Sequence, residues 1–92
     1  MPPLTDNEIK SRLVTVPDWQ MESGELVRTF LFKDFRASLA FVNKVGEIAE
    51  SAGHHPDIDI RYNKVRLALI THDAGGITQK DFDLAAASDK FC

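Results

Sequence analysis

The sequence predicts an α+β fold of order αββαββα, in which helices cover one face of a four-stranded antiparallel sheet. Three observations lead to this expectation. Helix-start signals occur at three places, two pairs of alternating apolar segments lie between them, and two residues typical of tight turns join each pair. With 92 residues, no internal repeat and no linker, the chain is expected to form a single domain over residues 1–92.

The first and third helices are expected to open with capping boxes. Thr5-Asp-Asn-Glu8 has this form and precedes Ile9, Leu13 and Val14, which give a short amphipathic helix that Pro17 stops. Near the end of the chain, the same form recurs in the segment 78–81 (Thr-Gln-Lys-Asp) and opens a helix that reaches almost to the C-terminus.

The second helix is expected to begin at Asp34, a favoured N-cap residue, and to run to about Ala52 before Gly53 ends it. Its apolar residues cover more than one narrow stripe, so one sheet face would not bury them all. They are Leu39, Phe41, Val42, Val45, Ile48, Ala49 and Ala52. Together with the open edges of a four-stranded sheet, this surface indicates a homo-oligomer.

Two hairpins are expected between the helices. Ser23-Gly24 and Asn63-Lys64 are plausible two-residue turns. The strands that they join span residues 19–22 and 25–32 in the first hairpin, and residues 57–62 and 65–71 in the second.

A turn at Asn63-Lys64 implies a definite register for the second hairpin. Ile60 then lies opposite Leu67, which places apolar side chains on one face and charged ones on the other. Extended backwards, the same register sets His55 opposite His72.

Composition excludes several classes of function. Eleven Lys and Arg against fourteen Asp and Glu give a net charge of −3, without a basic block, which argues against nucleic-acid binding. Cys92 is the one cysteine, so neither an intrachain disulfide nor a cysteine metal knuckle is expected, and a reducing, cytoplasmic compartment fits. The opening residues lack the apolar run of a secretory signal, and the longest aliphatic run, residues 67–70, is too short to span a membrane.

All three histidines, His54, His55 and His72, lie close together in the sequence, and the hairpin brings the ends of that stretch together. Imidazoles hold or release protons readily near neutral pH, so the cluster indicates general acid–base chemistry. Three imidazoles can also hold a catalytic Zn²⁺, but neighbouring residues of a strand point to opposite faces, which disfavours a shared ion. Ordinary hydrogen-bonded surface histidines are the third interpretation.

Other polar and aromatic residues each have two interpretations. Glu50 would orient an imidazole or be a solvated helix carboxylate, and Asp81 is first of all a capping-box acceptor. Trp19 and Tyr62 are expected in the core or on the sheet, although either ring would also suit stacking.

The spacing of these residues resembles the signature of the pterin-4a-carbinolamine dehydratases. That signature is an acid, three residues, His-His-Pro, five residues, an aromatic, nine residues, His, eight residues and Asp. In this chain it corresponds to Glu50, His54-His55-Pro56, Tyr62, His72 and Asp81. The likeness extends over about residues 5–88, including Trp19 and the segments 30–35, 62–65 and 71–78.

This resemblance implies a cytosolic enzyme that removes water from 4a-hydroxytetrahydropterin to give quinonoid dihydropterin, in tetrahydrobiopterin recycling beside an aromatic amino-acid hydroxylase. Such a dehydration moves two protons without a redox change, so neither a metal nor a cofactor is expected. Family members associate into homodimers or homotetramers, and vertebrate members also act as dimerisation cofactors for a homeodomain transcription factor. A protein-binding module is therefore the alternative function, and a relative with another hydrated substrate is a second enzyme alternative.

The resemblance also implies roles for individual residues. His54 and His72 correspond to the acid–base pair, and His55 belongs to the catalytic set as a substrate-binding residue. The expected substrate contacts further include Pro56, Thr71, His72, Asp73 and Ala74, with Glu50 and Asp81 as orienting residues. The hairpin register instead sets His55 opposite His72, so it supports proximity of the histidines without assigning their roles.

Overall fold

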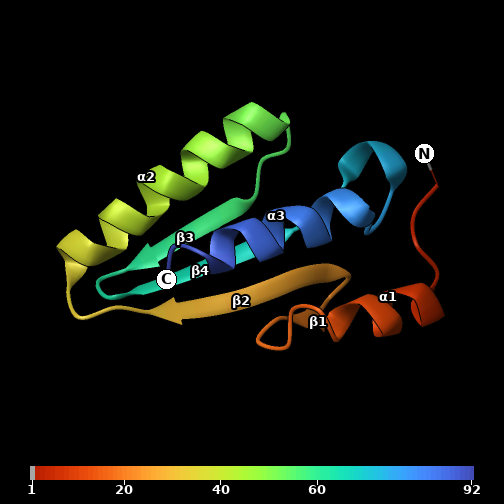
Figure 1. Ribbon diagram of the computed structural model, residues 1–92, viewed down its shortest axis with the longest axis horizontal. Coiled ribbons are helices and arrows are strands. Elements are labelled where there is room, and N and C mark those ends of the chain that lie inside the picture. Colours follow the sequence, from red (N-terminus) through yellow and green to blue (C-terminus); the bar gives the residue numbers. More distant parts are fainter. Residues whose placement is uncertain (1) are drawn as a thin grey trace.

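Three α-helices, one short 3-10 helix and four strands make up the computed structural model, which describes residues 2–92 (Figure 1). In chain order they are α1 (Asp6–Leu13), β1 (Gln20–Glu22), β2 (Glu25–Leu31), α2 (Phe35–Ala52), β3 (Asp57–Arg61), β4 (Lys64–Leu69), η1 (His72–Ala74) and α3 (Gln79–Asp89). The strands form one antiparallel sheet of order β1-β2-β4-β3. The expected αββαββα order is confirmed, and η1 is an addition to it.

The helix starts lie where the capping residues predict them. In α1 the Thr5 hydroxyl accepts a hydrogen bond from the Glu8 N–H at 3.2 Å, and the Glu8 carboxylate accepts one from the Thr5 N–H at 2.9 Å. Asp34 caps α2 by accepting from the Ala37 N–H. The expectation that Val14 belongs to the apolar face of this helix was wrong, because α1 ends at Leu13 and Val14 is an exposed C-cap residue.

The first hairpin also has the expected turn. Ser23 and Gly24 have φ angles of 50° and 82°, the left-handed backbone that tight hairpin turns require. Gln20 pairs with Val27 across the turn, and β2 ends at Leu31.

The register of the second hairpin differs from the expected one. Its turn is Tyr62-Asn63, one residue earlier than predicted, and Ile60 pairs with Val65 instead of Leu67. Paired residue numbers therefore add to 125 rather than 127. A shift of two residues keeps every side chain on its expected face, because the side-chain period of a strand is two.

Contacts with the neighbouring strand account for the position of this turn. The Asn63 side-chain amide donates to the Phe32 carbonyl at 3.1 Å, and the Phe32 N–H donates to the Asn63 carbonyl at 2.8 Å. Both bonds hold Asn63 inside the turn, at the end of β2, and Tyr62 takes the left-handed φ of 53°. The expected pairing of His55 with His72 is therefore wrong, since a sum of 125 would set His54 opposite Thr71.

Helices α2 and α3 lie on the same face of the sheet, whereas α1 lies beside β1 at its edge (Figure 1). The core between helices and sheet is built around Phe30, whose ring centroid lies 4.5 Å from that of Phe41 and 5.9 Å from that of Trp19. Burial of such aromatic side chains is the main stabilising contribution in a domain of this size. Trp19 is thus a core residue, while Tyr62 is exposed at its turn.

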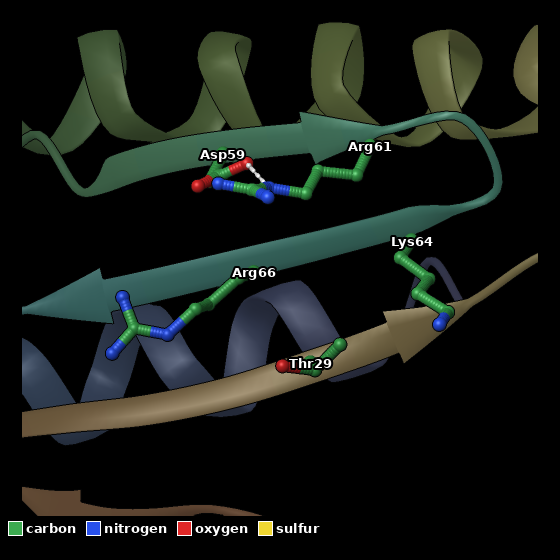
Figure 2. Close-up of a pocket in the computed structure, with 5 residues that line it drawn as sticks. All are labelled: Thr29, Asp59, Arg61, Lys64 and Arg66. Atoms are coloured by element: carbon green, nitrogen blue, oxygen red, sulfur yellow. Dashed lines mark hydrogen bonds and ion pairs between the residues drawn. The ribbon is translucent and has the colours of Figure 1, made fainter.

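Within residues 2–92, no helix covers the other face of the sheet, which carries charged side chains (Figure 2). A hollow of about 140 Å³ on this face is lined by Thr29, Asp59, Arg61, Lys64 and Arg66. Figure 2 shows how these five side chains lie on β2, β3 and β4. The Arg61 Nε lies 3.2 Å from the Asp59 carboxylate, and Arg66 reaches Glu22 of β1 at 3.7 Å. None of the three histidines is among the residues that line this hollow.

Within residues 2–92, none of the helices has the length and apolar character needed to cross a membrane.

Candidate active site

Two chain segments bring the histidines to one end of the sheet. The first is the exit of α2, where Gly53 has a φ of 63° and the His54 N–H donates back to the Ala49 carbonyl at 3.1 Å. This left-handed end turns the chain sharply, so that His54 and His55 lie between α2 and β3. In Figure 1 the end of α2, the turn η1 and the start of α3 meet at this end of the sheet.

The second segment is the loop between β4 and α3. Thr71 and Gly76 exchange backbone hydrogen bonds of 3.0 and 3.3 Å, which close residues 71–76 into a compact turn. Within it, Gly75 has a φ of 74°, a left-handed backbone that glycine adopts without strain. As a result, His72 and Asp73 lie on η1 at the surface.

An open hollow of about 220 Å³ lies between the two segments. It is lined by Gly53, His54, His55, Ile70, Thr71, His72, Asp73 and Lys80. A second hollow of similar size adjoins it and shares Thr71, Asp73 and Lys80, with Ala74 as its further wall. The structure thus brings the three histidines together at one place, although they come from different elements.

His54 is held by a buried carboxylate. Its Nε2 lies 2.6 Å from Asp81 Oδ1, and the exposed fractions of the two side chains are 11% and 0%. The other oxygen of Asp81 accepts hydrogen bonds from the Thr71 hydroxyl at 2.8 Å and the Thr78 N–H at 2.9 Å. A carboxylate paired with one imidazole nitrogen fixes the orientation and tautomer of the ring. Asp81 is therefore both the capping-box acceptor of α3 and the partner of His54.

His55 lies in a different environment from His54. Its Nε2 hydrogen-bonds to the Glu50 carboxylate, and both side chains are largely exposed, at 61% and 78%. Solvent screens such a pair, so Glu50 orients the ring without burying it. The two neighbouring histidines thus point to different partners, as expected of adjacent residues in extended chain.

His72 is exposed on η1, and its ring makes no hydrogen bond to another side chain or backbone group within residues 2–92. It therefore lines the hollow with both ring nitrogens available to a ligand. Pro56 lines neither hollow and lies at the entry to β3.

Among residues 2–92, no three His, Cys, Asp or Glu side chains converge in the way that would hold a metal ion. The donors around the hollow instead form two separate imidazole–carboxylate pairs, His54 with Asp81 and His55 with Glu50. Their chemistry is that of oriented proton donors and acceptors.

The family can be decided from the sequence as a whole. The sequence model described as "Pterin 4 alpha carbinolamine dehydratase" matches residues 2–91. The chain belongs to this family. The resemblance noted from the spacing of the histidines is thereby confirmed.

Similar proteins agree with this assignment over their whole length. A relative from Chloroflexus aurantiacus, provisionally named a pterin-4-alpha-carbinolamine dehydratase, is 61% identical over 90 residues, which cover 98% of this chain and 97% of the relative. A relative of the same provisional name from Acidobacterium capsulatum is 61% identical over 87 residues, covering 95% of each chain.

Solved structures share the fold. The crystal structure described as a transcriptional coactivator/pterin dehydratase from Brucella melitensis has a TM-score of 0.93 and 31% identity, and the match covers 97% of each chain. A pterin dehydratase-like protein described as a RuBisCO assembly factor in the alpha-carboxysome has a TM-score of 0.65 at 23% identity, covering 79% of this chain and 84% of that one. This second likeness concerns the fold alone.

Two residues of this candidate site, Lys80 and Thr78, were not expected from the sequence. Lys80 lines both hollows, and Thr78 joins the hydrogen bonds behind His54. A signal for both was present, because they flank Gln79 in the capping box that contains Asp81.

Proposed function

We propose that this chain removes water from a 4a-hydroxytetrahydropterin to give the quinonoid dihydropterin, by general acid–base catalysis from histidines. One observation carries the proposal: three histidines line a single open hollow, and one of them, His54, is held by the buried carboxylate of Asp81. Membership of the carbinolamine dehydratase family supports this class of reaction.

The reaction needs two proton movements. The C4a–O bond breaks as the leaving hydroxyl receives a proton and departs as water, and a ring nitrogen loses its proton as the new C=N bond forms. Each imidazole can give or take a proton near neutral pH, so two of them suffice and no electron leaves the substrate. A shallow hollow suits a flat heterocycle that is in contact with solvent water, the other product.

His54 and His72 divide the acid and base roles, since each comes from a different one of the two segments that line the hollow. His55, oriented by Glu50, binds the substrate at the rim. The polar backbone groups of residues 71–74 are suited to pair with the polar edge of a pterin, and Asp81 orients His54. Pro56 contributes by setting the path of the chain after His55, because its ring restricts the backbone there.

Decay of an enzymatically generated 4a-hydroxypterin, followed by absorbance with and without the protein, tests the proposal. We expect His54→Ala and His72→Ala to lower kcat by about a hundredfold or more, and His55→Ala chiefly to raise KM. Asp83→Asn, on the exposed side of α3, is the matched control and should keep full turnover. A His54→Ala protein with wild-type turnover would refute the assignment, and a rate that falls with EDTA would favour a metal.

The cellular setting follows from the same proposal. We infer a cytoplasmic enzyme that acts beside an aromatic amino-acid hydroxylase and forms a homodimer or homotetramer. Exposed Phe35 and Leu39 on α2, with exposed fractions of 46% and 40%, support self-association because water-exposed aromatic and aliphatic side chains favour burial. Sedimentation at micromolar concentration should show a multimer, and a monomer alone would contradict this.

The second candidate is a protein-binding module that acts as a dimerisation cofactor for a transcription factor. The description of the Brucella melitensis structure as a transcriptional coactivator/pterin dehydratase favours keeping it. The two functions are separable by co-purification. A protein partner that stays bound to a His54→Ala, His72→Ala double variant would support the second function independently of catalysis.

A further inference from the structure

A continuous chain of hydrogen bonds lies behind the hollow, on the side away from solvent. The hydroxyl oxygens of Thr78 and Thr71 are 2.8 Å apart, and the Thr71 hydroxyl donates to Asp81 Oδ2 at 2.8 Å. Asp81 Oδ1 then lies 2.6 Å from His54 Nε2. Thr71, Thr78 and Asp81 are all buried, so water does not compete for these bonds.

The direction of each bond in this chain is determined by its neighbours. The backbone N–H of Thr78 can only donate, and it donates to Asp81 Oδ2, so this oxygen accepts. The single proton of the Thr71 hydroxyl also goes to Oδ2, and the Thr78 hydroxyl therefore gives its proton to Thr71. An ionised carboxylate only accepts, so the bond to His54 must receive its proton from Nε2.

We propose that Thr71 is a positioning residue, whose hydroxyl holds Asp81 so that His54 stays protonated at Nε2 and exchanges protons with the substrate through Nδ1. Within residues 2–92, Nδ1 of His54 makes no hydrogen bond, which leaves it for a ligand. The expected role of Thr71 as a substrate contact changes accordingly. Its hydroxyl is used behind the hollow, and at most its backbone faces the ligand.

The part of this inference that concerns Nδ1 rests on the proposed dehydration, whereas the part that concerns the tautomer does not. Nitrogen NMR of the full chain labelled with ¹⁵N-histidine tests the tautomer without any substrate. The His54 signals are identified by their loss in a His54→Gln variant. We expect wild-type His54 to carry a proton on Nε2, the nitrogen that faces Asp81. A neutral His54 protonated on Nδ1 would overturn the proposal.

Two variants of Thr71 separate positioning from packing. Thr71→Val keeps the branched shape and removes the hydroxyl, and it should give a mixture of His54 tautomers and lower kcat by about tenfold with little change in KM. Thr71→Ser restores the hydroxyl on a smaller side chain and should recover the wild-type tautomer and kcat within about twofold. A Thr71→Val protein with wild-type spectrum and kcat would overturn the proposal.

These outcomes also distinguish failure of the inference from failure of the proposed function. If neither the wild type nor the variants accelerate dehydration, the function is wrong, and the tautomer measurement still decides the role of Thr71. If the wild type is active and Thr71→Val changes neither readout, the function stands and the positioning role is wrong. If Thr71→Val does not fold, the wild-type and Thr71→Ser spectra decide the tautomer.

Discussion

Replacing Asp81 by asparagine removes one charge from the buried side of the site while keeping the shape of the side chain. Asp81 is fully buried, and its two oxygens face three donors, from His54, Thr71 and the Thr78 backbone. An asparagine that turns its oxygen toward Thr78 must point its amide group at His54 Nε2. Two donors then face each other unless the ring changes its tautomer.

The expected loss of stability can be estimated from these contacts. A hydrogen bond lost from a buried charged group costs about 1.5–3 kcal/mol, so we expect the free energy of unfolding to fall by about 2 kcal/mol. For a domain of this size, such a loss lowers Tm by roughly 8–16 °C. Because the ring would present the wrong nitrogen to the hollow, we also expect kcat for dehydration to fall by about a hundredfold.

Urea unfolding and thermal melting at one fixed protein concentration measure the stability, and pterin decay measures kcat. Asp83→Asn is the control on the same helix, because Asp83 is exposed and accepts one bond from Gln79 at 2.9 Å. It should change the free energy of unfolding by less than about 0.5 kcal/mol. Wild-type stability and turnover in Asp81→Asn, or an equal loss in Asp83→Asn, would refute the reasoning.

Two further predictions concern the ends of the helices. Hydrogen bonding with Thr5, first through its backbone N–H, and then attraction to Arg12 lower the pKa of Glu8 from its ordinary value of 4.5. The contribution of ionised Glu8 to the free energy of unfolding is therefore complete above pH 4.5 and is lost as the pH falls through the lowered pKa. An NMR titration of the folded chain in which the pKa of Glu8 is 4.5 or higher would contradict this. Gly53→Ala should cost about 1 kcal/mol in thermal melting, because the φ of 63° strains any side chain. Its control, Gly46→Ala within α2, should gain about 0.5–1 kcal/mol, and a loss there as large as at Gly53 would count against a conformational cause.

Local signals were enough for most of the fold. The capping boxes at Thr5 and Thr78, the N-cap Asp34 and the turn at Ser23-Gly24 involve bonds between residues at most four positions apart. Such bonds depend little on the rest of the chain, so sequence patterns predict them well. The alternation of apolar and charged residues also placed the faces of β3 and β4 correctly, even with the register two residues off.

The register of β3 with β4 could not be predicted from the residues of that hairpin alone. The sequence pattern placed the turn at Asn63-Lys64, whereas hydrogen bonds between Asn63 and Phe32, a residue of a distant segment, hold it at Tyr62-Asn63. No pattern within the hairpin contains that information. Lys80 was missed although it directly precedes Asp81, which the family resemblance had placed at the site.

By itself, the sequence determined the order of elements, the family and the residue types of the site, because capping, periodicity and motif spacing are recorded in short stretches of chain. Only the tertiary structure decided which groups are partners. His54 is joined to Asp81, 27 positions away, whereas the adjacent His55 is joined to Glu50. Packing of α2, β4 and α3 sets those distances, and burial decides which pair is shielded from water. Two neighbouring histidines thereby have different partners and different exposure to water.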